Sequence, residues 1–274
     1  MLTKEKCGKV FDKWLWARCY KIYKDLNNYG DHFTVICGKE GRGKSTLLTQ
    51  MCAVISTDLF HSKHICYKMK QFTGGLKECQ KGDSFQLDEG NLFLFSREAM
   101  SGDNKAAVKL FSVIRMKNLH IGICVPNFYT LDTYIRDHRV DTLIRISDRG
   151  KYTAYVGEGI KIVSKEGAPY KNMNGIRLPL KWMTKGWYTK EIPQINDLST
   201  DEYNKHKEKN IDNFIDELDQ VARKTESGKW ISANQLAKAK GIDPRTAIKH
   251  IKNGNIKGHI LGNRYFINEN IEDM

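Results

Sequence analysis

Residues 38–45, Gly-Lys-Glu-Gly-Arg-Gly-Lys-Ser, match the pattern G-x-x-x-x-G-K-S/T at every fixed position. An apolar segment at 33–37 precedes them and a helical pattern at 44–56 follows, which is the strand–loop–helix context that this pattern requires. Glycines in such a loop let successive backbone N–H groups turn toward a phosphate at the positive end of a helix. The sequence therefore predicts a phosphate-binding loop carried by an α/β fold with a mostly parallel central sheet.

Two residues of this loop have specific expected tasks. Lys44 is expected to reach the β- and γ-phosphates of a bound nucleotide, and Ser45 to offer its hydroxyl to Mg²⁺. ATP and Mg²⁺ are accordingly the expected cofactors. The residues expected to contact the nucleotide are Gly38, Lys39, Glu40, Gly41, Arg42, Gly43, Lys44, Ser45 and Thr46.

A pair of acids ends the predicted strand at 84–88, about 40 residues beyond the loop. Asp88 is expected to hold Mg²⁺ through water, and Glu89 to orient or deprotonate the attacking water. The alternative is a surface acid pair after an ordinary strand. The phosphate loop upstream favours the catalytic interpretation.

The most apolar predicted strand, at 120–125, is expected to lie between the strands that carry these two motifs. Asn127 then lies where it could sense the γ-phosphate, although asparagine is also a common turn residue. Phosphoryl transfer further needs positive charge, often from a neighbouring subunit. The candidates are Arg115, Arg136 and Arg139, and a solvated arginine on a helix face is the alternative for each.

The segment from Arg115 to Asp132 resembles the FtsK–HerA superfamily of DNA-pumping ATPases, which includes many viral genome-packaging enzymes. In that family an arginine on a helix precedes a strand that ends in a polar sensor, followed by a short helix and another strand. The resemblance covers about residues 33–150 and implies a RecA-like domain, a pentameric or hexameric ring, and action of Arg115 on the neighbouring nucleotide. The chain departs from the family by placing Asn127 where glutamine is usual.

Other segments complete the predicted architecture. Strands that alternate with helices favour a sheet covered by helices on both faces. The further expected elements are an amphipathic helix at 8–26, a strand at 64–68, mostly helix at 97–118, a short helix at 129–138, a strand at 141–146, and a hairpin of 152–156 and 160–163.

Residues 226–274 have the pattern of a helix–turn–helix. Ser232 is the expected N-cap of the first helix and Gly241 the turn, and Asp243 caps a second helix that begins with Pro244. Residues 256–267 then alternate as a hairpin wing would.

This module is similar to the MerR/excisionase kind of winged helix–turn–helix, whose second helix enters the major groove of DNA. A helical module that binds protein is the alternative. The resemblance implies DNA contacts by Arg245, Thr246, Lys249, His250, Lys257 and Arg264.

The net charge of +13 favours a polyanionic partner, although a lysine-rich proteome would give the same balance. The basic segment at 165–190 contains Trp182 and Trp187, which could stack on nucleic-acid bases or pack against their own domain. The seven cysteines are scattered without a C-x-x-C pair, so neither a zinc site nor a disulfide framework is expected.

No apolar segment is long enough to cross a bilayer, and the polar N-terminus lacks a signal-peptide pattern. A cytoplasmic location is expected, in the host cell if the chain is viral. The expected division is an N-terminal helix in 1–32, a P-loop ATPase domain in 33–164, a basic extension with a helical connector in 165–225, and the winged domain in 226–274.

These features predict an ATP-driven motor on double-stranded DNA, most simply one that packages or translocates a viral or mobile-element genome, with a capsid or another assembly as a further partner. Two alternatives remain open. One is an AAA+-like switch in which ATP controls assembly on DNA for transposition or replication loading. The other is a phage morphogenesis ATPase of the zonular-occludens-toxin type, a branch that normally carries a transmembrane segment.

Overall fold

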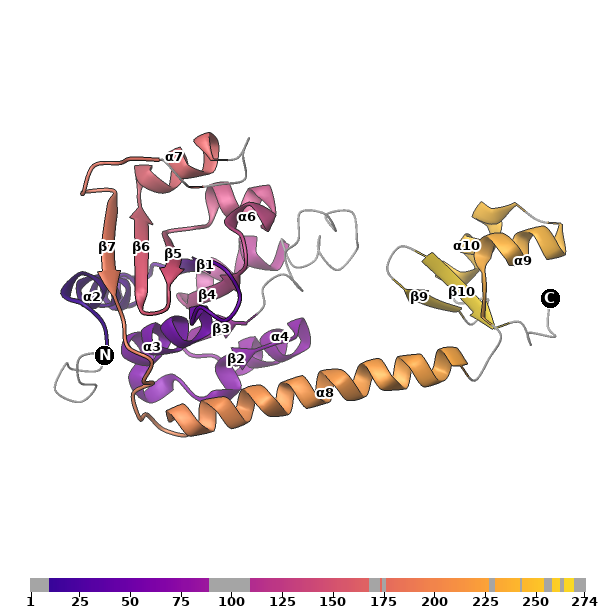
Figure 1. Ribbon diagram of the computed structural model, residues 1–274, viewed down its shortest axis with the longest axis horizontal. Coiled ribbons are helices and arrows are strands. Elements are labelled where there is room, and N and C mark those ends of the chain that lie inside the picture. The colour runs from indigo at the N-terminus through magenta and orange to yellow at the C-terminus, as the bar shows by residue number, and fades with distance from the viewer. Residues whose placement is uncertain are drawn as a thin grey trace. The chain divides into compact units, whose positions relative to one another are not determined.

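The computed structural model describes residues 10–88, 109–167, 173, 176–226, 230–241, 243–253, 258–261 and 264–268. Contacts between residues divide the chain into two compact units, Met1–His206 and Lys207–Met274. The long helix α8, Thr200–Glu226, begins in the first unit and continues into the second (Figure 1). No helix in the described ranges has both the length and the apolar character needed to cross a membrane.

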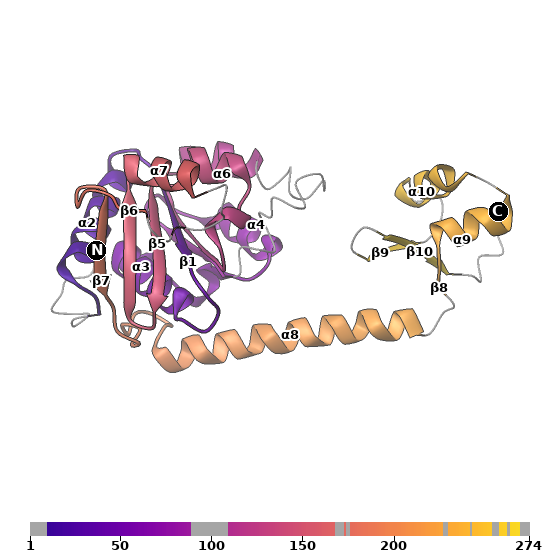
Figure 2. The same cartoon turned by 45° about the horizontal axis from the view of Figure 1, so that its top comes forward.

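The first unit is built on a seven-stranded sheet in the order β2-β3-β4-β1-β5-β6-β7. Strands β1 to β5 run parallel, and β6 and β7 are added antiparallel at one side (Figure 2). β4 lies between β3 and β1, as predicted for the strand between the two motif strands, and the predicted α/β fold with a mostly parallel central sheet is confirmed. The strands are β1 His32–Cys37, β2 Ile65–Cys66, β3 Ser84–Leu87, β4 His120–Val125, β5 Thr142–Asp148, β6 Lys151–Val156 and β7 Met183–Trp187.

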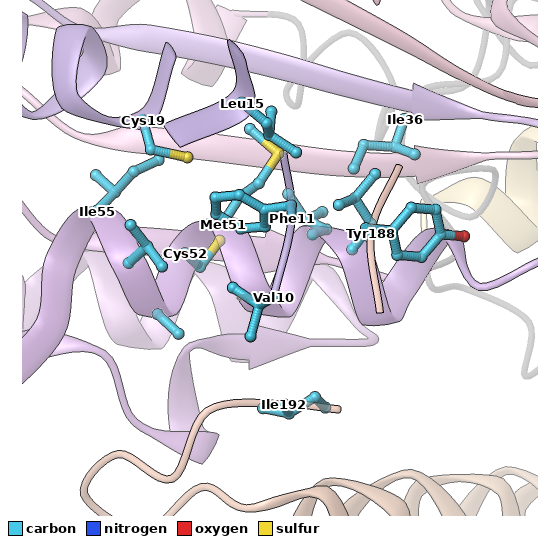
Figure 3. Close-up of a cluster of buried hydrophobic side chains, with 14 of the residues drawn as sticks. Val10, Phe11, Leu15, Cys19, Ile36, Met51, Cys52, Ile55, Tyr188 and Ile192 are labelled. Carbon is cyan, nitrogen blue, oxygen red and sulfur yellow. The ribbon is translucent and has the colours of Figure 1, made fainter. Parts of the chain in front are cut away.

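Helices cover both faces of this sheet because each presents an apolar stripe to it. One buried cluster joins the sheet to α2 and α3, and Figure 3 shows Leu15 and Cys19 of α2 facing Met51 and Cys52 of α3. A second cluster on the other face contains side chains of α4, α6 and α7. The helical elements are α2 Lys13–Asn27, α3 Lys44–Ser56, η1 Thr57–Leu59, η2 Ser62–His64, α4 Met69–Glu78, η5 Ile114–Lys117, η6 Phe128–Thr130, α6 Thr133–His138 and α7 Glu158–Glu166.

Buried polar side chains link neighbouring strands near their amino ends. His120 hydrogen-bonds Thr34 through Nε2 and Ser84 through Nδ1, each at 3.0 Å. His32 hydrogen-bonds Thr142 at 2.9 Å. Burial lowers the pKa of His120 to about 3, because a charged imidazole has little solvation there. These histidines are therefore neutral parts of the core at physiological pH.

The expected hairpin of 152–156 and 160–163 is wrong in its second strand. β6 pairs antiparallel with β5 and β7, whereas residues 160–163 lie inside α7. Gly157, at φ 53°, ends β6, and Ile160 and Val163 then face the core from adjacent positions on one helix. The predicted strand at 64–68 is also shorter than expected, since β2 contains only Ile65 and Cys66.

The basic segment that follows α7 contributes to the sheet. β7 pairs antiparallel with β6, with Met183 opposite Tyr155 and Trp187 opposite Lys151. Trp187 is 45% exposed, and the Lys181 ammonium lies 4.5 Å from the centre of the Trp182 ring. The expected helix at 97–118 is helical from residue 109 to Lys117, and residues 97–108 lie outside the described ranges.

The second unit contains the elements expected for residues 226–274. Ser232 accepts a hydrogen bond from the Gln235 backbone N–H at 3.2 Å, Gly241 ends the first helix at φ 66°, and Asp243 accepts from the Arg245 N–H at 2.7 Å. Its three-stranded sheet has the order β8-β10-β9. The elements are β8 Trp230–Ser232, α9 Ala233–Lys240, α10 Pro244–Lys252, β9 Gly258–Leu261 and β10 Arg264–Asn268.

Candidate nucleotide-binding site

The loop between β1 and α3 takes the conformation that its glycines permit. Gly38, Gly41 and Gly43 have φ angles of 148°, 70° and 88°, a region that side chains disfavour. Gly43 is the N-cap of α3 and supplies no side-chain cap, so no side chain competes for the first amides of the helix. This is the geometry of an anion-binding helix terminus.

The lysine and the serine of the loop face different partners. Lys44 Nζ donates to the carbonyl oxygens of Gly38 at 2.9 Å and Lys39 at 3.1 Å, so its ammonium lies within the curve of the loop. Ser45 Oγ donates to Asp88 Oδ1 at 2.6 Å, which joins the start of α3 to the end of β3. The structure therefore brings together the two motifs that the sequence predicted.

The second oxygen of Asp88 lacks a partner. Asp88 is 2% exposed, and its Oδ2 atom is buried without a hydrogen bond to any described residue. A buried carboxylate oxygen in this state is costly unless a cation or a donor binds it. Mg²⁺ prefers oxygen ligands and usually binds one or two carboxylates together with phosphates and water. Ser45 and Asp88 thus fit magnesium, and they are the residues that would hold it.

A second contact fixes the two motif segments relative to each other. Thr49, one turn into α3, donates to Gln86 Oε1 of β3 at 2.7 Å, and both residues are buried. Gln86 Nε2 also donates to the Ser45 carbonyl at 3.4 Å. The spacing between the Ser45 hydroxyl and the Asp88 carboxylate is therefore held by side chains beneath them.

The phosphate loop is braced from outside by the turn between β5 and β6 and by Tyr188. Arg42 forms an ion pair with Asp148, and Arg149 Nη2 donates to the Gly41 carbonyl at 3.0 Å. Tyr188, which is 5% exposed, donates its hydroxyl to the Arg42 carbonyl at 2.8 Å. Sequence reasoning did not assign Tyr188 to this site, because its partner lies 146 positions away in the chain.

A cavity of about 290 Å³ opens beside the first residues of the loop and is lined in part by Gly38, Lys39, Asn127 and Arg145. Asn127 follows β4 and accepts a hydrogen bond from the Tyr129 N–H at 3.0 Å, so it is also the cap of η6. Arg145 lies opposite Cys37 on the neighbouring strand and adds a guanidinium to this cavity. Its position near the carboxyl end of a predicted strand was the only sequence signal for it.

Comparisons with known proteins give distant likenesses of fold. No protein-family model matches the chain, and no curated protein matches its sequence. The N-terminal domain of zonular occludens toxin from Neisseria meningitidis is similar at 15% identity and a TM-score of 0.38, over 58% of this chain and 94% of that domain. A point mutant of RuvB from Thermotoga maritima is similar at 14% identity and a TM-score of 0.33, over 93% of each chain.

Arg115 lies at the opposite end of the strands from the phosphate loop. It is exposed in η5, immediately before β4, and the first residue of β4, His120, lies opposite His32 at the start of β1. The loop follows the other end of β1. Arg115 therefore cannot serve the nucleotide of its own protomer without a large rearrangement.

Arg136 and Arg139 also lie near the amino ends of the strands. Arg136 Nε donates to Asp137 at 2.9 Å and to Ser164 at 3.1 Å. Arg139 pairs with Asp31 at 2.5 Å, and its side chain is 10% exposed. A cavity of about 930 Å³ opens at this edge, whereas ligands of parallel sheets bind at the carboxyl ends of the strands. The structure does not bring these two arginines together with the phosphate loop.

Several predicted site residues fall outside what the structure describes. Glu89 and Lys257 are not among the described residues, and only the backbone of Arg264 is described. In α10, Arg245, Thr246 and Lys249 are exposed and His250 is half-buried. With Lys252, which is also exposed, the second helix of the module presents three cations to solvent.

Proposed function

We propose that this chain is an ATP-hydrolysing motor that acts on double-stranded DNA. The observation that carries the ATPase part is the contact of Ser45 with Asp88 at the N-terminus of α3, beside a buried Asp88 oxygen with no partner among the described residues. A structural serine–aspartate pair would not need a glycine loop, an uncapped helix terminus and a lysine directed into the loop. Together these groups suit a magnesium-bound nucleoside triphosphate.

Each residue of the site has a task in this proposal. The loop amides and Lys44 hold the β- and γ-phosphates, and Ser45 and Asp88 position Mg²⁺. When bound, Mg²⁺ neutralises charge that develops on the phosphates during transfer. Glu89 follows Asp88 in sequence and orients or deprotonates the attacking water. Asn127, on the rim of the cavity beside Gly38, senses the γ-phosphate through its amide.

The DNA part of the proposal rests on charge and on the second unit. The chain carries a net charge of +13, and α10 exposes Arg245 and Lys249 after the cap formed by Asp243 and Pro244. A short capped helix with exposed cations, followed by a β-hairpin, suits insertion into a major groove with the hairpin against phosphates. The second unit would then load or recognise the duplex.

The place of Arg115 supports the proposal that the protein is an oligomer. An exposed arginine at the far end of the strands can act on a phosphate only in another protomer, so we place it at a subunit interface of a ring. Packaging or translocation of a viral or mobile-element genome is the process that fits a ring of DNA-acting ATPases, with a capsid or similar assembly as the further partner.

Steady-state hydrolysis of Mg²⁺·ATP by the full chain tests the proposal, with Lys44→Ala and Lys63→Ala compared in parallel. Lys44→Ala is expected to lower kcat/KM by about 10²- to 10³-fold, as for loss of one charge-stabilising group. Lys63→Ala is the matched control, because it removes an exposed lysine of the same unit whose ammonium lies 3.7 Å from Glu78, away from the loop. Equal activity in wild type and Lys44→Ala would refute the assignment of the site.

A further inference from the structure

The cavity beside the first residues of the phosphate loop is lined by cations only. Three of the described residues that line it are charged, and all three are positive: Lys39, Arg42 and Arg145. The larger cavity at the amino ends of the strands, by contrast, is lined by acids and by lysines and arginines in equal number. A recess whose walls carry one sign of charge concentrates ions of the opposite sign. The smaller cavity therefore favours an anion.

Two residues of this cavity are also partners of Lys44. Gly38 and Lys39 both line the cavity, and their carbonyl oxygens accept hydrogen bonds from the Lys44 ammonium at 2.9 and 3.1 Å. The phosphate-loop pattern assigns this lysine to the β- and γ-phosphates of a nucleotide. Asn127, at the end of β4, lines the same cavity. The cavity thus adjoins the place where the terminal phosphate of a bound nucleotide is expected.

The pairing of β5 with β1 brings Arg145 to the start of the loop. In this parallel pair, Arg145 lies opposite Cys37, the residue that precedes Gly38, and Figure 2 shows β5 beside β1. The two segments remain close one residue further on, since a Cβ atom at Gly38 would lie 2.7 Å from the Ile146 carbonyl oxygen. Only glycine lets the loop approach β5 so closely. Backbone packing therefore holds Arg145 next to the first residue of the loop.

The alternation of side chains along β5 directs Arg145 into the cavity. Ile144 and Ile146 belong to the core cluster that contains α3, whereas Leu143 belongs to the cluster on the other face of the sheet. Arg145 extends from the same face as Leu143, where it is half-buried and lines the cavity. It also hydrogen-bonds the Tyr155 side chain. A guanidinium has five donors, so it can hold this partner and an anion at the same time.

We infer that Arg145 contacts the nucleotide of its own protomer by donating hydrogen bonds to the γ-phosphate. The inference rests on the proposed nucleotide site and adds to it a cation that distinguishes a nucleoside triphosphate from a diphosphate. A guanidinium matches phosphate oxygens with two parallel donors, which a point charge does not. The three arginines predicted from the sequence lie at the opposite edge of the sheet, and Arg145 provides within one chain the charge that they do not.

Calorimetric titration of the full chain with Mg²⁺·ATPγS and with Mg²⁺·ADP tests the inference. Arg145→Gln removes the charge and keeps a polar side chain. This variant is expected to bind Mg²⁺·ATPγS about 10- to 100-fold more weakly than wild type, the range for hydrogen bonds to a charged group. Its affinity for Mg²⁺·ADP is expected to stay within about twofold of wild type, because ADP lacks the phosphate that the lost bonds would reach.

Arg18→Gln is the matched control for the loss of a half-buried arginine. The Arg18 guanidinium donates to Thr142 Oγ1 at 2.8 Å and to the Asp141 carbonyl at 2.7 Å, at the other end of the strand that carries Arg145. This variant is expected to keep wild-type affinity for both nucleotides. Urea unfolding establishes first that each variant is folded.

Arg145→Lys is the second variant, and it decides the question on the same criterion if Arg145→Gln does not fold. Lysine keeps the positive charge but loses the planar pair of donors. Its affinity for Mg²⁺·ATPγS is expected to lie between those of wild type and Arg145→Gln, with the affinity for Mg²⁺·ADP unchanged.

The outcomes separate the inference from the nucleotide site on which it rests. If wild type binds both nucleotides and substitution of Arg145 weakens neither, or weakens both equally, Arg145 does not contact the γ-phosphate and the inference is refuted, while the site stands. An equal loss of ATPγS affinity in Arg18→Gln would also refute it, because the effect would then come from a general disturbance of the sheet. Failure of wild type to bind either nucleotide would refute the site and the inference together.

Discussion

Gly43 and Tyr188 are predicted to be energetically coupled. A Cβ atom at Gly43 would lie 2.8 Å from the Tyr188 hydroxyl oxygen and 3.6 Å from the nearest ring carbons, so only the hydroxyl obstructs it. Gly43→Ala should cost ~1–2 kcal/mol for the left-handed φ of 88°. The steric contact should add ~1–3 kcal/mol, as for other overpacked sites. Tyr188→Phe alone should cost ~1 kcal/mol, because it removes the hydrogen bond to the Arg42 carbonyl.

The double variant should be more stable than the two single variants imply, because phenylalanine no longer carries the obstructing oxygen. A coupling energy of ~1–3 kcal/mol is expected, within the range found for residues in contact. Urea unfolding of the four proteins without nucleotide measures it, and Gly43→Ala combined with Tyr152→Phe is the control pair, which should be additive. Additivity of Gly43→Ala and Tyr188→Phe within ~0.5 kcal/mol would refute the described support of the loop.

Three further predictions concern stability, the ring and DNA. Because burial lowers the pKa of His120 to about 3 from an ordinary 6.5, the unfolded chain binds the proton first as pH falls. The contribution of His120 to the free energy of unfolding should therefore drop by ~1.4 kcal/mol for each pH unit between 6.5 and about 3, and His32 adds a drop of the same sign. Equal urea midpoints at pH 6.5 and 4.5 would contradict this. Mixing Arg115→Ala with Lys44→Ala protomers should restore part of the ATPase activity, because the Lys44→Ala protomer supplies Arg115 to a neighbour whose phosphate loop still has Lys44. If mixing restores no activity, Arg115 does not act on the nucleotide of a neighbouring protomer. Lys249→Ala should reduce the slope of log affinity against log salt for a DNA duplex by ~0.9, measured by fluorescence anisotropy, whereas an unchanged slope would exclude a phosphate contact.

Local signals explain why much of the fold was predictable from the sequence. The helix at 44–56 has the predicted bounds, because the glycine loop fixes its start and an apolar stripe continues through it. The order of β3, β4 and β1 followed from the motifs at the strand ends. The caps of α9 and α10 were predicted at Ser232 and Asp243, since both depend on neighbours within three residues.

Contacts between distant segments explain what the sequence did not show. The sequence pattern predicts a strand at Ile160 and Val163, but the same two side chains also fit one face of a helix. The packing of α7 against the sheet decides between the two structures. Tyr188 looked like part of a basic, aromatic stretch, and only the folded chain places it beneath Arg42. Tyr203 lies in a strongly charged helix, and its burial depends on packing in the same core cluster as α3 and Ile192.

The most direct test of the central claim is steady-state ATP hydrolysis by the full chain with and without long double-stranded DNA, alongside Glu89→Gln. The account predicts that DNA stimulates turnover, that stimulation grows with duplex length, and that Glu89→Gln abolishes it while ATP still binds. Slow turnover that long DNA leaves unchanged would contradict a motor, and would favour an ATP-controlled assembly switch at the same site.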